Sequence, residues 1–197
     1  MLKWIFCALL ATLPAASVYG QTPEVAPGVY LPASSVSVVD HDSKGEVKAF
    51  RLESAVMASD PHTGSNIAKG AVFVNQHNSI QIVGKSAPTV LQDAQPSFYV
   101  RLPDEHRDLM RSQVTLIRMK PTVETRIAIE FSANSFGGHR KRKIDEIQVE
   151  KTDVQGGDWV KVTPSKPLDP GEYGLMFLPQ DPNAYSQTIY DVSVPAK

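Results

Sequence analysis

The sequence predicts an all-β protein, and three observations support this prediction. Fifteen prolines and twelve glycines divide the chain into many short segments, which favours strands over helices. Several of these segments alternate apolar and polar residues with the period of two that is typical of half-buried strands. The C-terminal part, residues 166–194, has the pattern of a β-hairpin that closes a β-domain.

The C-terminal hairpin begins at the segment Asp169-Pro170-Gly171-Glu172. Proline fixes φ near the value required at the second position of a turn, and Gly171 accepts the positive φ of the third position. The strand that follows is apolar on both faces and is expected inside a sheet, with Tyr173, Leu175 and Phe177 on one face and Gly174, Met176 and Leu178 on the other. The return strand, 186–194, is expected to be half-buried, with Asp191 on its polar face.

Residues 21–91 are predicted to form a smaller β-subdomain. Its apolar segments are bounded by turn-forming residues and are expected to be strands: 28–31, 36–39, 47–52, 71–74 and 80–83. Phe50 and Leu52 fall on one face of the third strand. Residues 40–45 and 59–66 are polar and are predicted loops, and Asn75–Asn78 is a predicted turn.

Residues 84–96 are predicted to connect this subdomain to a β-sandwich of about seven strands over residues 96–197. We expect Val90 and Leu91 to dock against one side. The sequence leaves open whether 21–91 and 96–197 are separate domains.

The predicted sandwich strands are 98–102, 114–119, 126–131, 144–154 and 158–163, followed by the C-terminal hairpin. Alternation places Ile127, Ile129 and Phe131 on one apolar face. Residues 155–157 are expected to join a hairpin, with Val160 and Val162 sharing a face. Residues 103–111 form the one predicted helical turn, because proline opens the segment and an arginine closes it. Residues 132–143 are a predicted loop.

The first twenty residues have the pattern of a secretory signal peptide. Lys3 supplies the positive charge, residues 4–13 an apolar core, and residues 14–20 a stretch of small residues. We expect cleavage after Gly20, or alternatively after Ser17. The mature chain is then secreted to the periplasm or the cell surface, without a transmembrane segment.

The composition excludes several function classes. The 20 basic and 21 acidic residues nearly balance, which argues against general affinity for nucleic acid. The single cysteine, Cys7, lies inside the predicted signal, so neither a disulfide nor a thiol nucleophile is expected in the mature chain. No hydrolase motif is present, and the chain is predicted to be non-enzymatic and to need no cofactor.

The most unusual segment of the chain is the cationic run from His139 to Lys143. We predict that His139, Arg140, Lys141, Arg142 and Lys143, on a flexible loop, bind an anionic envelope polymer such as lipopolysaccharide, or an envelope protein. The alternative is a solvated loop whose charges keep the edge of a strand soluble. Tyr185, in a polar loop after Pro179, is the aromatic residue expected to be exposed. Packing explains the aromatic residues Trp159, Tyr173, Phe177 and Tyr190.

Two other groups of residues have the residue types of a functional site. Asp40-His41-Asp42 and Asp60-Pro61-His62 have metal-binding residue types, but adjacent ligands in an extended segment point to opposite faces. Surface loops explain them better. Glycosidase carboxylates have no local spacing rule, so the acidic residues of the predicted strands and turns could serve: Glu124, Glu130, Glu146 or Glu150.

The C-terminal segment Leu168-Asp169-Pro170-Gly171-Glu172-Tyr173, with Tyr190-Asp191-Val192, resembles the end of certain small secreted bacterial proteins of unassigned function. Pro27–Tyr30 and Phe98–Pro103 are similar to the opening and middle segments of those proteins. Pro-Gly-Glu-Tyr also recurs in prealbumin-like and Ig-like β-sandwich modules. Gly174 and Val192 stand where the resemblance implies Ala and Phe. The resemblance implies a β-fold and an envelope location, and no activity.

These observations leave three hypotheses. The leading one is an exported, non-enzymatic envelope protein that binds through residues 134–143 and 179–184. The second is a carbohydrate-active or other hydrolytic accessory domain, which a cleft with two facing carboxylates would favour. The third is a structural subunit of an envelope assembly.

Overall fold

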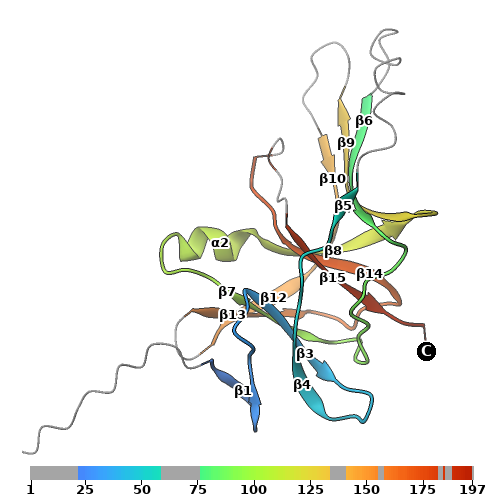
Figure 1. Ribbon diagram of the computed structural model, residues 1–197. Helices are drawn as coiled ribbons and strands as arrows, with labels where there is room; N and C mark the ends of the chain where they lie inside the picture. The colour runs from blue at the N-terminus through green and yellow to red at the C-terminus, as the bar shows by residue number, and fades with distance from the viewer. Residues whose placement is uncertain are drawn as a thin grey trace, which may run out of the picture.

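The computed structural model describes residues 22–58, 76–133, 141–154, 158–181, 184 and 188–196. The predicted signal peptide and the predicted strand 71–74 lie outside these residues. Within the described part, the chain forms strands and one short helix (Figure 1). The prediction of an all-β, sandwich-like fold is confirmed. No described helix is both long and apolar enough to cross a membrane.

The described strands form two large sheets. A five-stranded sheet has the order β12 (Val149–Asp153), β13 (Trp159–Pro164), β7 (Ser97–Arg101), β3 (Val36–His41) and β4 (Val47–Arg51). An eight-stranded sheet has the order β15 (Ile189–Val194), β14 (Gly171–Phe177), β8 (Val114–Pro121), β9 (Thr125–Ala133), β6 (Gln76–Val83) and β5 (Met57–Ala58); β10 (Lys141–Lys143) pairs with β9, and β11 (Asp145–Ile147) with β8. A small hairpin of β1 (Glu24–Ala26) and β2 (Val29–Tyr30) forms a separate two-stranded sheet, and Val25 of β1 packs against Tyr99 and Trp159 of the five-stranded sheet.

Strands β8, β14 and β15 are covered by side chains on both faces. On one face, Leu116, Leu175 and Val192 pack against Phe98 and Val160 of the five-stranded sheet. On the other face, residues of the same three strands join a second core with β6 and β9: Ile117, Met119, Met176, Ile189, Ile80, Ile82, Ile129 and Phe131. Strand β14 is therefore interior, as its two apolar faces predict. Figure 1 shows β6, β9 and β10 side by side at the top and β3 with β4 at the bottom.

The predicted boundary at 84–96 does not separate two cores. Strand β3, from the N-terminal segment, pairs with β7, from the C-terminal one, and Val38 packs in the same core as Val160. The connecting segment docks on this core, as expected, through Leu91, which is 1% exposed. The buried carboxylate of Asp40 accepts hydrogen bonds from the backbone N–H groups of Gln92 and Asp93 and fixes the segment in place.

A β-bulge in β9 overturns the predicted alternation of that strand. Two consecutive residues of β6, Ile80 and Gln81, pair with Ile129 and Ile127 of β9. Ala128 is therefore the additional residue of the bulge. Ile129 and Phe131 remain in the second core, but Ile127 is only half-buried. Arg126, which strict alternation would place on the face opposite Ile129, is 1% exposed. Strict alternation fails here because the extra residue changes the face of every side chain before it.

Four further elements differ from the predictions. Helix α2 spans Arg107–Gln113 rather than 103–111, because His106 has a left-handed φ of 62° and delays its start. Residues 76–78 belong to β6 rather than to a turn, and 141–143 form β10 rather than loop. The segment 144–154 is two strands, β11 and β12, which belong to different sheets.

Helix α2 is attached to β12 by three hydrogen bonds, two donated by Lys151 and one by Arg111. Lys151 Nζ donates to the carbonyl oxygens of Arg111 (2.9 Å) and Ser112 (3.2 Å), at the C-terminal end of the helix. Arg111 Nη2 donates to the carbonyl oxygen of Lys151 at 2.7 Å. Burial lowers the pKa of Lys151. These contacts give the cations of α2 and β12 a structural role.

The β14–β15 hairpin is confirmed, but Gly171 does not have the predicted positive φ. It begins β14, and a Cβ atom there would lie 3.2 Å from Arg118 Nε. Gly171 therefore lets the guanidinium of Arg118 approach the backbone. The return strand is buried on both faces, and Asp191, expected on a polar face, is 3% exposed.

Candidate functional site

The cationic run predicted from the sequence is only partly described. His139, Arg140 and Tyr185 lie outside the described residues, and of Lys141 only the backbone, in β10, is described. Arg142 and Lys143 follow in the same strand, and the alternation of β10 places them on opposite faces. The two side chains therefore have different surroundings.

Arg142 connects the two segments that were predicted to make contacts. Its Nη1 atom donates to the carbonyl oxygens of Asp181 (3.3 Å) and Ala184 (3.1 Å). The guanidinium thus attaches the segment after β14 to β10. Arg142 has a structural partner, and Lys143 is the described cation of the run that faces a pocket.

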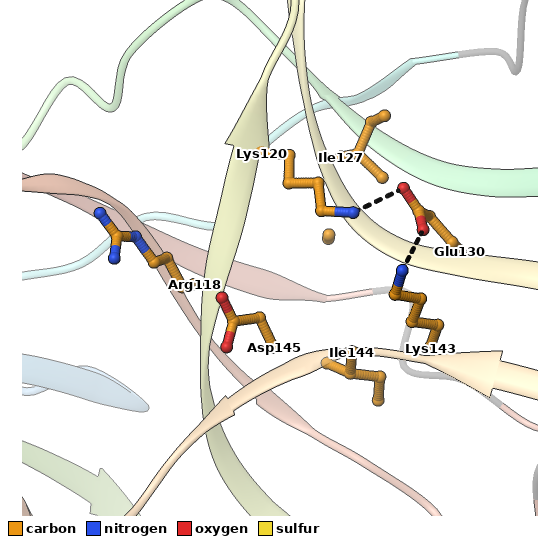
Figure 2. A pocket seen from close by; sticks show the side chains of 8 residues that line it. Arg118, Lys120, Ile127, Glu130, Lys143, Ile144 and Asp145 are labelled. Carbon is orange, nitrogen blue, oxygen red and sulfur yellow. Dashed lines mark hydrogen bonds and ion pairs between the residues drawn. The ribbon is translucent and has the colours of Figure 1, made fainter.

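The pocket lies where strands β8 and β9 separate. The two strands pair at Lys120 with Ile127 and at Pro121 with Arg126. Beyond that point β8 pairs with β11 and β9 with β10, and the chain crosses from one to the other at Ile144. We call the resulting hollow of about 260 Å³ the wedge pocket; its lining is Arg118, Lys120, Ile127, Ala128, Glu130, Lys143, Ile144 and Asp145 (Figure 2).

The bulge at Ala128 provides part of the wedge pocket. Without the extra residue, Ile127 and Glu130 would lie on opposite faces of β9. With it, both line the pocket. Ile127 and Ile144 give an apolar lining, and the charged groups lie around it (Figure 2). Bulges beside a site commonly redirect side chains in this way.

Two lysines of the wedge pocket converge on one carboxylate. Lys120 Nζ lies 3.0 Å from Glu130 Oε1, and Lys143 Nζ lies 4.0 Å from Glu130 Oε2 (Figure 2). The side chains of Lys120 and Lys143 are 54% and 77% exposed. Such exposed ion pairs contribute little stability, so an external anion can exchange for the carboxylate at low cost.

Arg118 forms one end of the wedge pocket and is held in place. Its Nη2 atom donates to the carbonyl oxygen of Pro170 at 2.9 Å, and its Nη1 lies 3.7 Å from Asp169 Oδ2. The close approach to Gly171 fixes the same guanidinium. The pocket therefore contains three cationic side chains and two carboxylates, Glu130 and Asp145.

The other predicted candidates have structural partners or lie apart. Asp42 accepts hydrogen bonds from the backbone of Lys44 and Glu46 and pairs with Lys48, which lowers its pKa to about 2. No group of three or more His, Cys, Asp and Glu residues within the described ranges could hold a metal ion. Asp60 and His62 lie outside those ranges.

The predicted packing of the aromatic residues is confirmed for those that the structure describes. Trp159 and Tyr173 are buried. Phe177 and Tyr190 pack against the core between the two large sheets. Tyr173 Oη donates to the carbonyl oxygen of Asp169 at 2.7 Å, and burial raises the pKa of this phenol. These side chains do not form an exposed platform.

Sequence reasoning missed Arg118 and Lys120 as site residues. Arg118 lies on the predicted strand 114–119 and Lys120 just beyond it, but their alignment with Lys143 depends on the crossing of the chain at Ile144 and on the bulge in β9. Neither feature has a local sequence signal. The one indication was the charge of the β8 segment, where Arg118 and Lys120 alternate with apolar residues.

Comparisons with protein-family models, with curated proteins and with solved structures found no match.

Proposed function

We propose that this chain is an exported, non-enzymatic protein of the bacterial envelope that binds an anionic group of an envelope polymer or protein in the wedge pocket. The convergence of Lys120 and Lys143 on Glu130, beside an apolar lining, carries the proposal. Export rests on the signal-like segment 1–20, and the non-enzymatic role on the lack of catalytic motifs.

The electrostatics of the wedge pocket favour an anion. Its three cations exceed its two carboxylates, whereas the whole chain is formally −1. An incoming phosphate or carboxylate would accept the contacts that Lys120 and Lys143 now make to Glu130. Because these groups are exposed, such binding should weaken as salt is added.

The test is a titration of residues 21–197 with lipopolysaccharide at low and at moderate salt. We expect Lys120→Ser with Lys143→Ser to weaken binding about tenfold, since each exposed charge pair contributes up to about 1 kcal/mol and about 1.4 kcal/mol is a factor of ten. The matched control is Lys44→Ser with Lys85→Ser, which removes the same charge from exposed positions outside the pocket. Equal affinity of both double variants would contradict the proposal.

The presence of Glu130 and Asp145 in one pocket favours the hydrolytic alternative as a second candidate. Glu130 is paired with Lys120, so it does not present the free carboxyl group that a general acid requires. Glu130→Gln separates the two functions. Binding predicts that this variant holds the anion more tightly, because a competing carboxylate is gone, whereas hydrolysis predicts loss of turnover on a glycan substrate.

A further inference from the structure

A second hollow adjoins the wedge pocket at Arg118. It measures about 210 Å³ and is lined by Arg118, Glu146, Ile147, Gln148, Ser165, Lys166, Pro167, Leu168, Asp169 and Tyr173. We call it the side pocket. Arg118 and the neighbouring residues Asp145 and Glu146 of β11 connect the two hollows.

The side pocket differs from the wedge pocket in charge. Arg118 is shared with the wedge pocket. The other charged groups of the side pocket are one cation, Lys166, and two carboxylates, Glu146 and Asp169, so this hollow has no excess of positive charge. Gln148, Ser165 and Lys166 are exposed, and Pro167 presents an apolar ring beside them. Carboxylate, amide and hydroxyl groups around an apolar patch suit a neutral ligand rich in hydroxyl groups, because both donors and acceptors are available.

The strand beneath both hollows argues against an extended peptide as ligand. Peptides that add to a sheet use the free backbone groups of an edge strand. Residues Leu116–Arg118 of β8 pair with β14 on one side and with β11 on the other. Strand β11 is itself only three residues long. Recognition here therefore depends on side chains, as it does for a glycan.

Building on the proposed anion binding, we propose that the ligand is an acidic glycan in which an anionic residue, bound in the wedge pocket, is adjacent to a neutral sugar, bound in the side pocket. Arg118 contacts both units. The spacing is that of neighbouring hollows along β8, where Lys120 and Arg118 are two residues, or roughly 7 Å, apart.

The test compares three oligosaccharides of equal length by titration calorimetry. A hyaluronan oligosaccharide alternates a uronate with a neutral N-acetylated sugar, an oligogalacturonate carries an anion on every residue, and a chito-oligosaccharide is neutral. We expect hyaluronan to bind most tightly, with an advantage of roughly fivefold over oligogalacturonate. The variant Glu146→Ala with Lys166→Ala should remove this advantage and leave the affinity for oligogalacturonate unchanged.

This double variant leaves the net charge unchanged, and both side chains are exposed, so folding should be retained. Its matched control is Lys44→Ala with Glu105→Ala, two exposed residues outside both hollows. Equal binding of hyaluronan and oligogalacturonate, both weakened by Lys120→Ser with Lys143→Ser, would overturn the glycan inference and leave the proposed function standing. Binding that neither pair of variants alters would overturn both.

Discussion

Arg126 is the residue on which the polar interior depends. Its Nη1 lies 3.1 Å from Glu172 Oε2 and its Nη2 2.7 Å from Asp191 Oδ2, although the latter contact lacks the angle of a hydrogen bond. Its Nε donates to the carbonyl oxygen of Gly84 at 3.0 Å. One guanidinium thus pairs with two buried carboxylates and joins β9, β14 and β15 to the segment after β6.

Arg126→Met is expected to destabilise the protein by about 3–5 kcal/mol, because it leaves two carboxylates buried without a cation. Urea denaturation measures this loss. The triple variant with Glu172→Gln and Asp191→Asn should recover much of it, since the amides carry no charge. A small loss in the single variant would contradict the role assigned to Arg126.

Gly174 stands where the resemblance to small secreted bacterial proteins implies alanine, and its neighbours explain the difference. A Cβ atom at Gly174 would lie 2.7 Å from Cγ2 of Ile189 in the paired strand β15, which is too close for an alanine without a shift. Gly174 pairs with Asp191. The branched Ile189 of β15, which pairs with Met176, occupies the space beside the glycine from the diagonal position. The two residues are coupled through the second core.

Gly174→Ala is expected to cost about 1–3 kcal/mol through overpacking. Ile189→Leu removes the branch that clashes while conserving volume, so the double variant should be more stable than the sum of the single changes predicts. Denaturation midpoints of the four proteins in this cycle give the coupling. If the two stability changes are strictly additive, the contact with Ile189 does not limit the size of the residue at position 174.

At the scale of elements, period-two patterns predicted the strands well where the strand is regular. Tyr173 and Leu175 face one core and Met176 the other, and Val160 and Val162 share a face, as expected. The pattern failed for Ile127 and Arg126, because a single bulge residue shifts the alternation and has no local signal. It also missed the switch of sheets between β11 and β12, which depends on pairing partners distant in sequence.

For the whole molecule, the fold class could be predicted and the division into two parts could not. Proline and glycine content and alternation report short strands, but they do not report which strands pair. β3 pairs with β7, and β6 pairs with β9, so the two segments share sheets and a core. The wedge pocket depends on the same long-range pairing, which explains why only Lys143 of its described lining was predicted as a binding residue.

The proposed function requires that an anion binds in the wedge pocket. Its most direct test is an NMR titration of ¹⁵N-labelled protein with an acidic oligosaccharide, following the backbone amide shifts. We expect concentration-dependent shifts centred on Lys120, Glu130 and Lys143, and their loss in Lys120→Ser with Lys143→Ser. Shifts confined to other surfaces, such as α2 or β4, would contradict anion binding in the wedge pocket.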